Sequence, residues 1–164
     1  MAEQELEVKF YLQKPAALEA RLKQLGAALV QPRIYELNLR YDLPSGELTS
    51  AKRVLRLRQD MKAHLTYKGP SEDREDVNAR NEIEIEVSDF ITTRHLLEAL
   101  GYVVNVIYEK HRKTYTLDDL IITLDQMPFG EFAEIEGPDP EGIRACAHKL
   151  HLDWSAQRMD SYMG

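Results

Sequence analysis

The sequence predicts an α+β protein built on an eight-stranded antiparallel β-barrel, with helices packed on the outside of the barrel. Three observations support this fold class. Polar and apolar residues alternate in eight separate stretches, amphipathic helical stretches lie between some of them, and the polar residues of the alternating stretches are almost all charged. Because side chains alternate between the two faces of a strand, a closed sheet would turn its ionic face inward and leave its apolar face for helices to cover.

The period of two is clearest at the start of the chain, where Glu5, Glu7 and Lys9 interleave with Leu6 and Val8. The same alternation recurs in five later stretches, and two more stretches are weaker candidates. The eight expected strands span residues 5–12, 33–42, 54–58, 64–68, 82–87, 107–115, 120–125 and 132–136.

Three stretches carry apolar residues at helical spacing, residues 15–25, 91–100 and 141–150. Gly26 and Gly101 follow the first two and predict where these helices end. Each of these two helices follows an alternating strand, so the chain contains a strand–helix unit that recurs. The recurrence indicates a single pseudo-symmetric domain over residues 1–164. The polar stretch 71–81 is predicted to be a mobile loop.

Composition narrows the classes of partner. Charged residues make up 30% of the chain, above the usual share of about 25%, and the net charge is −7, which does not favour nucleic-acid binding. Cys146 is the single cysteine, so neither an intramolecular disulfide nor a cysteine metal site is expected. No apolar run approaches the roughly 18–20 residues of a membrane helix. We therefore expect a cytoplasmic protein with neither a nucleic-acid nor a membrane partner.

The charged faces combine both signs. The acidic positions are Glu5, Glu7, Glu82, Glu84, Asp125, Glu134 and Glu136, and the basic positions are Lys9, Arg56, Arg58, Lys68, Arg80, Lys110 and Arg112. One such strand alone is usually a solvated face with cross-strand ion pairs. Repeated along seven strands, the pattern favours a ligand, because a lumen lined with charges is costly unless they pair or bind something.

The two kinds of charge suit two kinds of ligand. Clustered lysines and arginines bind phosphate oxygens, and clustered carboxylates bind hard divalent cations such as Mg²⁺ or Mn²⁺. Phosphoryl transfer requires both together, since cations and metal must offset the charge on the phosphate oxygens. A phosphate-bearing substrate and a divalent metal are therefore expected.

These motifs resemble the CYTH domain family, the triphosphate tunnel metalloenzymes, which include class IV adenylyl cyclases, thiamine triphosphatases and inorganic triphosphatases. Glu5-Leu6-Glu7-Val8-Lys9 looks like the family's Glu-x-Glu-x-Lys signature, and the resemblance covers nearly the whole chain. Further motifs follow in the family's order: Tyr41-Asp42, Leu55-Arg56-Leu57-Arg58, Thr66-Tyr67-Lys68-Gly69-Pro70, Arg80 with Glu82 and Glu84, Glu109-Lys110-His111-Arg112, Leu124-Asp125, and Gly130-Glu131-Phe132 with Glu134-Ile135-Glu136. Ser161-Tyr162 looks like the family's closing Ser-Tyr.

The resemblance implies a triphosphate tunnel and assigns roles to its residues. Asp125, Glu134 and Glu136 would hold a metal on the phosphates, with Glu5 and Glu7 near a second metal, and we add Glu84 to these metal-binding carboxylates. The triphosphate would be bound by Lys9, Arg56, Arg58, Lys68, Lys110 and Arg112, to which we add Arg80. Tyr41 and Lys68 match a pair that activates water in thiamine triphosphatases.

Three functions are consistent with this pattern. The first is metal-dependent hydrolysis of inorganic tripolyphosphate or an organic triphosphate such as thiamine triphosphate. The second is the class IV adenylyl cyclase reaction, which converts ATP to cyclic AMP and pyrophosphate. The third is a non-catalytic polyphosphate-binding module, which would not need clustered carboxylates. We favour hydrolysis, because no pocket that would read an adenine base can be located in the sequence, and we allow for a homodimer.

Overall fold

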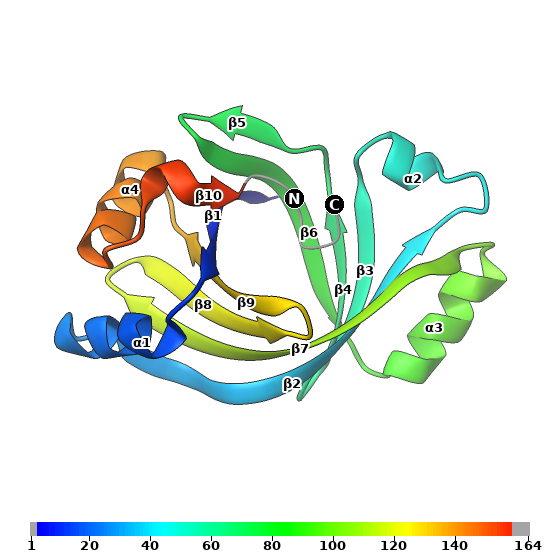
Figure 1. The fold of residues 1–164 in the computed structure, drawn as a ribbon. Coiled ribbons are helices and arrows are strands. Elements are labelled where there is room, and N and C mark those ends of the chain that lie inside the picture. The colour runs from blue at the N-terminus through cyan, green and yellow to red at the C-terminus, as the bar shows by residue number, and fades with distance from the viewer. Residues whose placement is uncertain (1–2, 159–164) are drawn as a thin grey trace. The chain divides into compact units, whose positions relative to one another are not determined.

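The structure is a computed structural model that describes residues 3–158 (Figure 1). The Ser161-Tyr162 pair lies outside these residues. The chain divides into two compact units, which are described separately below. Of the described residues, unit 1 contains 3–4, 35–72 and 80–109, and unit 2 contains 5–34, 73–79 and 110–158. Within residues 3–158, none of the helices has the length and apolar character needed to cross a membrane.

The strands pair in antiparallel fashion wherever their register is resolved. In chain order the elements are β1 (Glu3–Leu12), α1 (Pro15–Gln24), β2 (Ala28–Asp42), α2 (Glu47–Ser50), β3 (Val54–Gln59), β4 (Ala63–Lys68), β5 (Glu72–Arg74), β6 (Val77–Val87), α3 (Phe90–Ala99), β7 (Val103–Leu117), β8 (Leu120–Met127), β9 (Gly130–Glu136), α4 (Pro140–Lys149), the 3₁₀ turn η1 (Trp154–Ala156) and β10 (Gln157–Arg158).

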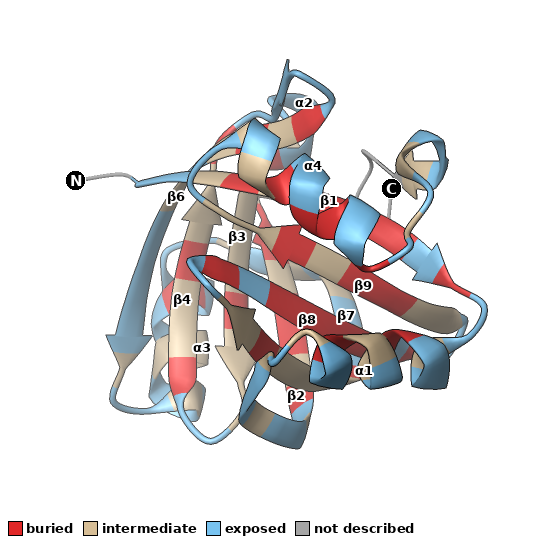
Figure 2. Cartoon of the chain, turned by 90° about the vertical axis from the view of Figure 1, so that its left-hand side faces the viewer, coloured by how far each residue is buried: buried red, intermediate tan, exposed pale blue. Residues whose placement is uncertain are grey.

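Unit 2 is built around strands in the order β10-β1-β9-β8-β7. Val8 lies opposite Ile135, and Ile135 lies opposite Ile122, so the apolar residues of three strands form one row on one face. Leu22 of α1 and Ile143 of α4 join these residues in a single buried cluster. Figure 2 shows the buried residues running along β8 and β9. The helices therefore cover the apolar face of these strands, as the sequence predicts.

Unit 1 contains the strand order β2-β3-β4-β6. Leu39, Leu57 and Leu65 lie opposite one another on one face, and Leu97 of α3 packs against this row. The register thereby places the even-numbered residues of β2, β3, β4 and β6 together on the opposite face. Each unit thus has one apolar and one polar face. In unit 1, α3 packs against the row on β2, β3 and β4, whereas Ile83 and Ile85 of β6 on the same face are exposed.

The eight predicted strands are all found within residues 3–158, and the three predicted helices lie within a residue of their expected positions. The stretch 71–81 is a correction, because it is not a loop. It forms the β5–β6 hairpin, whose turn residues Glu75 and Asp76 have φ values of 53° and 64°. Two successive residues with positive φ are typical of a two-residue hairpin turn, and such turns usually contain Gly or Asn. The turn residues here are Glu75 and Asp76, so the sequence did not indicate a hairpin.

The short helix α2 was not predicted. Asp42 stabilises it from the end of β2 by accepting hydrogen bonds from the backbone nitrogens of Leu48 (2.9 Å) and Thr49 (3.0 Å). Burial would raise the pKa of Asp42, but hydrogen bonds from Thr49, Leu48 and Leu43 lower it to about 2. Asp42 therefore has a structural role at neutral pH, as an ionised cap.

Candidate functional site

The polar face of unit 2 gathers predicted site residues from four neighbouring strands. Residues directly opposite each other on antiparallel strands share a face and have neighbouring Cβ atoms. Lys9 of β1 lies opposite Glu134 of β9, and Glu134 lies opposite Thr123 of β8. Two residues further along each strand, on the same face, Glu7 lies opposite Glu136. The predicted acids and bases of β1 and β9 are therefore adjacent on this face.

Asp125 of β8 is the centre of a buried ion cluster on the same unit. Arg112 donates from Nε to Oδ1 at 2.6 Å and from Nη2 to Oδ2 at 2.7 Å, and Lys110 donates from Nζ to Oδ2 at 3.0 Å. The side chains of Asp125 and Lys110 are 0% and 2% exposed. The two cations of β7 are thus held in place by one carboxylate, and Nη2 of Arg112 also lies 3.8 Å from Oε2 of Glu134.

Both carboxylates remain ionised at neutral pH. Burial would raise the pKa of Asp125, but the charges of Arg112 and Lys110 outweigh it and hold this pKa well below its usual value. Burial and the neighbouring Asp125 would raise the pKa of Glu134, yet Arg112, Lys9 and Lys110 lower it to about 2. These two carboxylates therefore keep their negative charge in the pH range of most enzymes.

The predicted metal ligands fit a divalent cation only in part. Among the described residues, no group of three or more acidic, histidine or cysteine side chains is arranged to hold a metal ion. Both oxygens of Asp125 contact Lys110 and Arg112, so Asp125 acts as their counter-ion. Glu7 and Glu136 fit better, because they lie directly opposite each other on β1 and β9 and so place two carboxylates side by side. Mg²⁺ typically binds through one or two carboxylates together with the phosphates of a substrate. The pair of glutamates can supply these carboxylates.

The polar face of unit 1 carries the other predicted phosphate-binding residues. Arg58 of β3 lies 3.3 Å from Glu84 of β6, and Thr66 donates to the same carboxylate at 3.0 Å. Lys68, at the end of β4, lies 3.5 Å from Glu82. Glu84, predicted to bind metal, therefore pairs with a base of unit 1 in this structure, and its metal role stays a prediction.

Arg80 stabilises the backbone of unit 1 through its side-chain hydrogen bonds. Its Nε donates to the backbone oxygen of Gly69 at 2.8 Å, and its Nη2 donates to the backbone oxygen of Lys52 at 3.4 Å. The first bond holds the turn that directly follows Lys68, and the second links Arg80 to the segment between α2 and β3. Arg80 thus positions the chain next to a predicted substrate-binding residue, and its own contact with substrate stays a prediction.

Tyr41 requires a correction. It lies opposite Leu55 and belongs to the apolar cluster of unit 1 with Leu39, Leu57 and Leu97, where it is 3% exposed. Tyr41 lies opposite Leu55, and Leu55 lies opposite Tyr67, so these three side chains share one face. Lys68 follows Tyr67 and therefore lies on the other face. The structure does not bring these two side chains together as a water-activating pair. Burial accordingly raises the pKa of Tyr41.

We therefore expect Tyr41→Phe to keep turnover within about twofold of the unmodified chain. The hydroxyl of Tyr41 is buried and has no hydrogen-bond partner among residues 3–158, so its removal should not lower the melting temperature. Tyr115→Phe is the matched control, since that hydroxyl donates to Glu19 at 2.9 Å and its loss should cost about 1 kcal/mol of stability. A 100-fold loss of turnover in folded Tyr41→Phe would restore the predicted pair.

Some residues of these faces were missed by the sequence analysis. They are Asn38, Arg40, Thr66 and Thr123, all on the polar faces of their strands. For Asn38 and Arg40, the alternation of β2 could have indicated this position, because the even-numbered residues of β2 share a face with Arg56 and Arg58. The weaker hydrophobic pattern of residues 33–42 concealed it.

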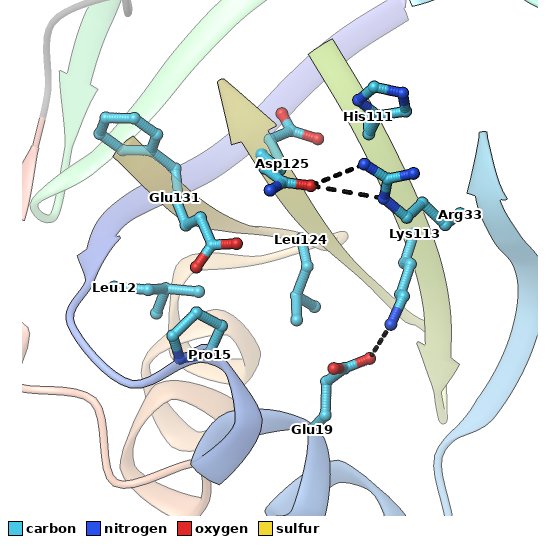
Figure 3. A pocket seen from close by; sticks show the side chains of 11 residues that line it. Leu12, Pro15, Glu19, Arg33, His111, Lys113, Leu124, Asp125 and Glu131 are labelled. Atoms are coloured by element: carbon cyan, nitrogen blue, oxygen red, sulfur yellow. Dashed lines mark hydrogen bonds and ion pairs between the residues drawn. The ribbon is translucent and has the colours of Figure 1, made fainter. Parts of the chain in front are cut away.

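A pocket of about 100 Å³ lies in unit 2, lined by residues of α1 and of β7, β8 and β9 (Figure 3). Its charges are mostly paired. Arg33 donates to Gln126 at 2.9 Å, and Lys113 lies 2.8 Å from Glu19. Among the predicted site residues only Asp125 contributes to its lining. The pocket therefore does not account for the phosphate-binding and metal-binding pattern.

Comparison with known proteins gives a consistent family and fold. The model of the CYTH domain matches residues 3–149. A putative adenylate cyclase of Methanocaldococcus jannaschii is 26% identical over 134 residues, which cover 80% of this chain and 75% of that protein. A Pyrococcus horikoshii protein of known structure is 25% identical, with a TM-score of 0.83 and 97% of both chains covered.

A Vibrio parahaemolyticus putative adenylate cyclase has a TM-score of 0.86 at 24% identity, with 99% of this chain and 97% of that chain covered. A likeness at this level of identity concerns the fold. It confirms the predicted fold class, an α+β protein with an antiparallel β-barrel and external helices.

Proposed function

This chain belongs to the CYTH domain family, and from that premise we propose that it hydrolyses a triphosphate-bearing substrate with the help of Mg²⁺ or Mn²⁺. The observation that carries the proposal is the polar face of unit 2. There the acidic pair Glu7 and Glu136 lies two residues along the strands from Lys9 and Glu134. Carboxylates for a metal and cations for phosphate oxygens are thus adjacent, which is the combination that phosphoryl transfer requires.

The basic residues would bind the phosphate groups, and the acidic residues would bind the metal. Lys9, Lys110 and Arg112 would bind phosphate oxygens, and so would Arg56 and Arg58. Glu7 and Glu136 would hold the metal, which supplies positive charge to the phosphate oxygens as the leaving group departs. Asp125 would keep Arg112 and Lys110 oriented until phosphate oxygens replace or join it, because its hydrogen bonds fix both side chains.

Lys68 remains the proposed proton acceptor for the attacking water. That role requires the neutral amine, so the 3.5 Å ion pair between Lys68 and Glu82 would have to open in the substrate complex. Tyr41 has no part in this step, since it lies in the apolar cluster of unit 1.

Cyclisation of ATP is the second candidate, and the name of the Methanocaldococcus jannaschii relative favours it. A putative adenylyl cyclase of Hippeastrum, described as having a dominant triphosphatase activity, shares the fold with a TM-score of 0.74 at 19% identity and covers 97% of this chain and 93% of that chain. That protein carries a cyclase name and hydrolyses triphosphate, which is consistent with our choice. A non-catalytic binding module is less consistent with the opposed Glu7 and Glu136.

A substrate panel tests the choice. Tripolyphosphate, ATP and thiamine triphosphate are incubated with the protein and Mg²⁺ or Mn²⁺, and phosphate, pyrophosphate and cyclic AMP are measured. We expect phosphate from at least one triphosphate and little cyclic AMP from ATP. Cyclic AMP and pyrophosphate in equal amounts from ATP, without phosphate from any substrate, would overturn hydrolysis in favour of cyclisation.

Arg58→Ala should weaken tripolyphosphate binding by about 1.5–3 kcal/mol, the usual contribution of hydrogen bonds to charged groups. Isothermal titration calorimetry measures the dissociation constant. Arg53→Ala is the control, because Arg53 only approaches Glu47 at 4.0 Å and is not among the predicted phosphate ligands. Equal affinities of Arg58→Ala and the unmodified chain would remove Arg58 from the phosphate site.

A further inference from the structure

The polar face of unit 1 contains an arginine that the proposed function leaves unassigned. Arg40 of β2 lies directly opposite Arg56 of β3. Side chains in such a position share a face, with Cβ atoms roughly 4.5–5.5 Å apart, and like charges placed there destabilise the sheet. A bound anion would offset the repulsion between these two guanidinium groups.

Arg40 has no counter-ion of its own. It is only partly exposed, and within residues 3–158 its side chain forms no hydrogen bond or ion pair. Other bases of the same face differ, since Arg58 lies 3.3 Å from Glu84 and Lys68 lies 3.5 Å from Glu82. The charge of Arg40 is thus the one on this face that the described structure leaves uncompensated.

The next pair along the two strands adds donors to the same face. Asn38 lies opposite Arg58 and is 0% exposed. The Nε atom of Arg58 is buried and makes no hydrogen bond to any described residue, although Oδ2 of Asp60 lies 3.5 Å away. Buried donors without acceptors are rare in folded proteins, and a phosphate group offers several acceptor oxygens.

We propose that Arg40 is a substrate-binding residue that, together with Arg56, contacts one phosphoryl group of the triphosphate. Guanidinium groups bind phosphate oxygens in a bidentate manner, and two of them side by side match the charge of close to −2 on a terminal phosphate group. A phosphoryl group bound between Arg40 and Arg56 would offset the repulsion between the two guanidinium groups. This inference rests on the proposed function and deepens it, because it adds a phosphate ligand that the sequence motifs did not indicate.

Arg40→Gln tests the proposal, since glutamine keeps most of the length and removes the charge. Calorimetric titration with tripolyphosphate, in the absence of metal, should show a dissociation constant about 10- to 100-fold higher than that of the unmodified chain. Arg40→Lys should lie between the two, because it keeps the charge and loses the bidentate fork. In the absence of ligand, Arg40→Gln should melt at the same or a higher temperature, because a like-charge pair is removed.

Arg94→Gln is the matched control. Arg94 lies on α3, its side chain is 41% exposed and it pairs with Glu98 in the next turn, and its replacement changes the net charge by the same amount. Its affinity for tripolyphosphate should stay within about twofold, since exposed pairs contribute little.

The outcomes separate the two proposals. If Arg56→Gln weakens binding and Arg40→Gln does not, the role of Arg40 is wrong and the proposed function stands. If Arg40→Gln lowers the melting temperature of the ligand-free protein along with its affinity, Arg40 is structural and the inference fails. If the unmodified chain does not bind tripolyphosphate at all, the proposed function fails and this inference fails with it.

Discussion

Replacing both Glu134 and Glu136 by glutamine is expected to lower the rate of triphosphate hydrolysis by about 10²–10³-fold or more, the usual cost of removing groups that stabilise charge in the transition state. Glu136 lies opposite Glu7, and Glu134 lies opposite Lys9. Glutamine keeps the shape of each side chain and removes the charge that a divalent cation needs. The metal should therefore bind poorly and the phosphate oxygens should lose its positive charge.

The matched control for this double variant is Glu131→Gln. Glu131 lies on the same strand, opposite Leu12 and Gln126 on the face turned toward the apolar cluster, so the same chemical change should leave turnover unaffected. Initial rates are compared at saturating Mg²⁺, and circular dichroism checks that each variant is folded. Full turnover in the double variant would remove Glu136 from the metal site and would show that the charge of Glu134 is not needed for hydrolysis.

Asp125→Asn is expected to destabilise the protein by about 3–5 kcal/mol, because removing one partner of a buried ion pair leaves the other charge uncompensated. Asp125 and Lys110 are almost completely buried, and Arg112 loses its bidentate partner as well. For a chain of this size, such a loss should lower the melting temperature by roughly 6–20 °C. Tripolyphosphate should recover part of this loss, since it can replace the missing negative charge.

Asp119→Asn is the control, because it makes the same change at an exposed position in the turn between β7 and β8. Its effect should be within about 0.5 kcal/mol. Thermal or urea unfolding of both variants measures the difference. Equal stabilities would show that the Asp125 cluster contributes nothing net, as some buried ion pairs do.

The pH dependence of stability follows from the same carboxylates. Asp125 and Glu134 have lower pKa values in the folded chain than in the unfolded chain, where about 3.9 and 4.3 are usual. Their contribution to stability is therefore complete above about pH 4–5. The contribution of Glu134 is lost as the pH falls through about 2, and that of Asp125 is lost in the same acidic direction. The melting temperature of the unmodified chain should fall over this acidic range, and that of Asp125→Asn should fall less steeply.

The sequence predicted the strands and the charged character of their polar faces because a period of two can be read directly from residues such as Glu5 to Leu12. The period also determines which residues share a face within a strand. Gly26 and Gly101 likewise indicated the ends of helices α1 and α3, since both glycines have positive φ.

The register between strands and the partner of each charge were beyond a single sequence. Nothing in the sequence shows that Asp125 accepts from both Arg112 and Lys110, because those contacts depend on the pairing of β7 with β8. Tyr41 was assigned by its place next to Asp42 in a motif, and the alternation of β2 then turned it toward Leu97. Its neighbour Arg40 faces Arg56 for the same reason.

Metal-dependent release of phosphate from tripolyphosphate tests the proposed function most directly. The initial rate is measured at saturating Mg²⁺, again after addition of excess chelator, and once more after Mg²⁺ is restored. We expect phosphate release with Mg²⁺, a fall to the background rate in chelator and full recovery on restoration, because Glu7 and Glu136 are placed to bind a hard cation together with phosphates. An unchanged rate in excess chelator would contradict the metal role, and no phosphate release under any of the three conditions would contradict hydrolysis of this substrate.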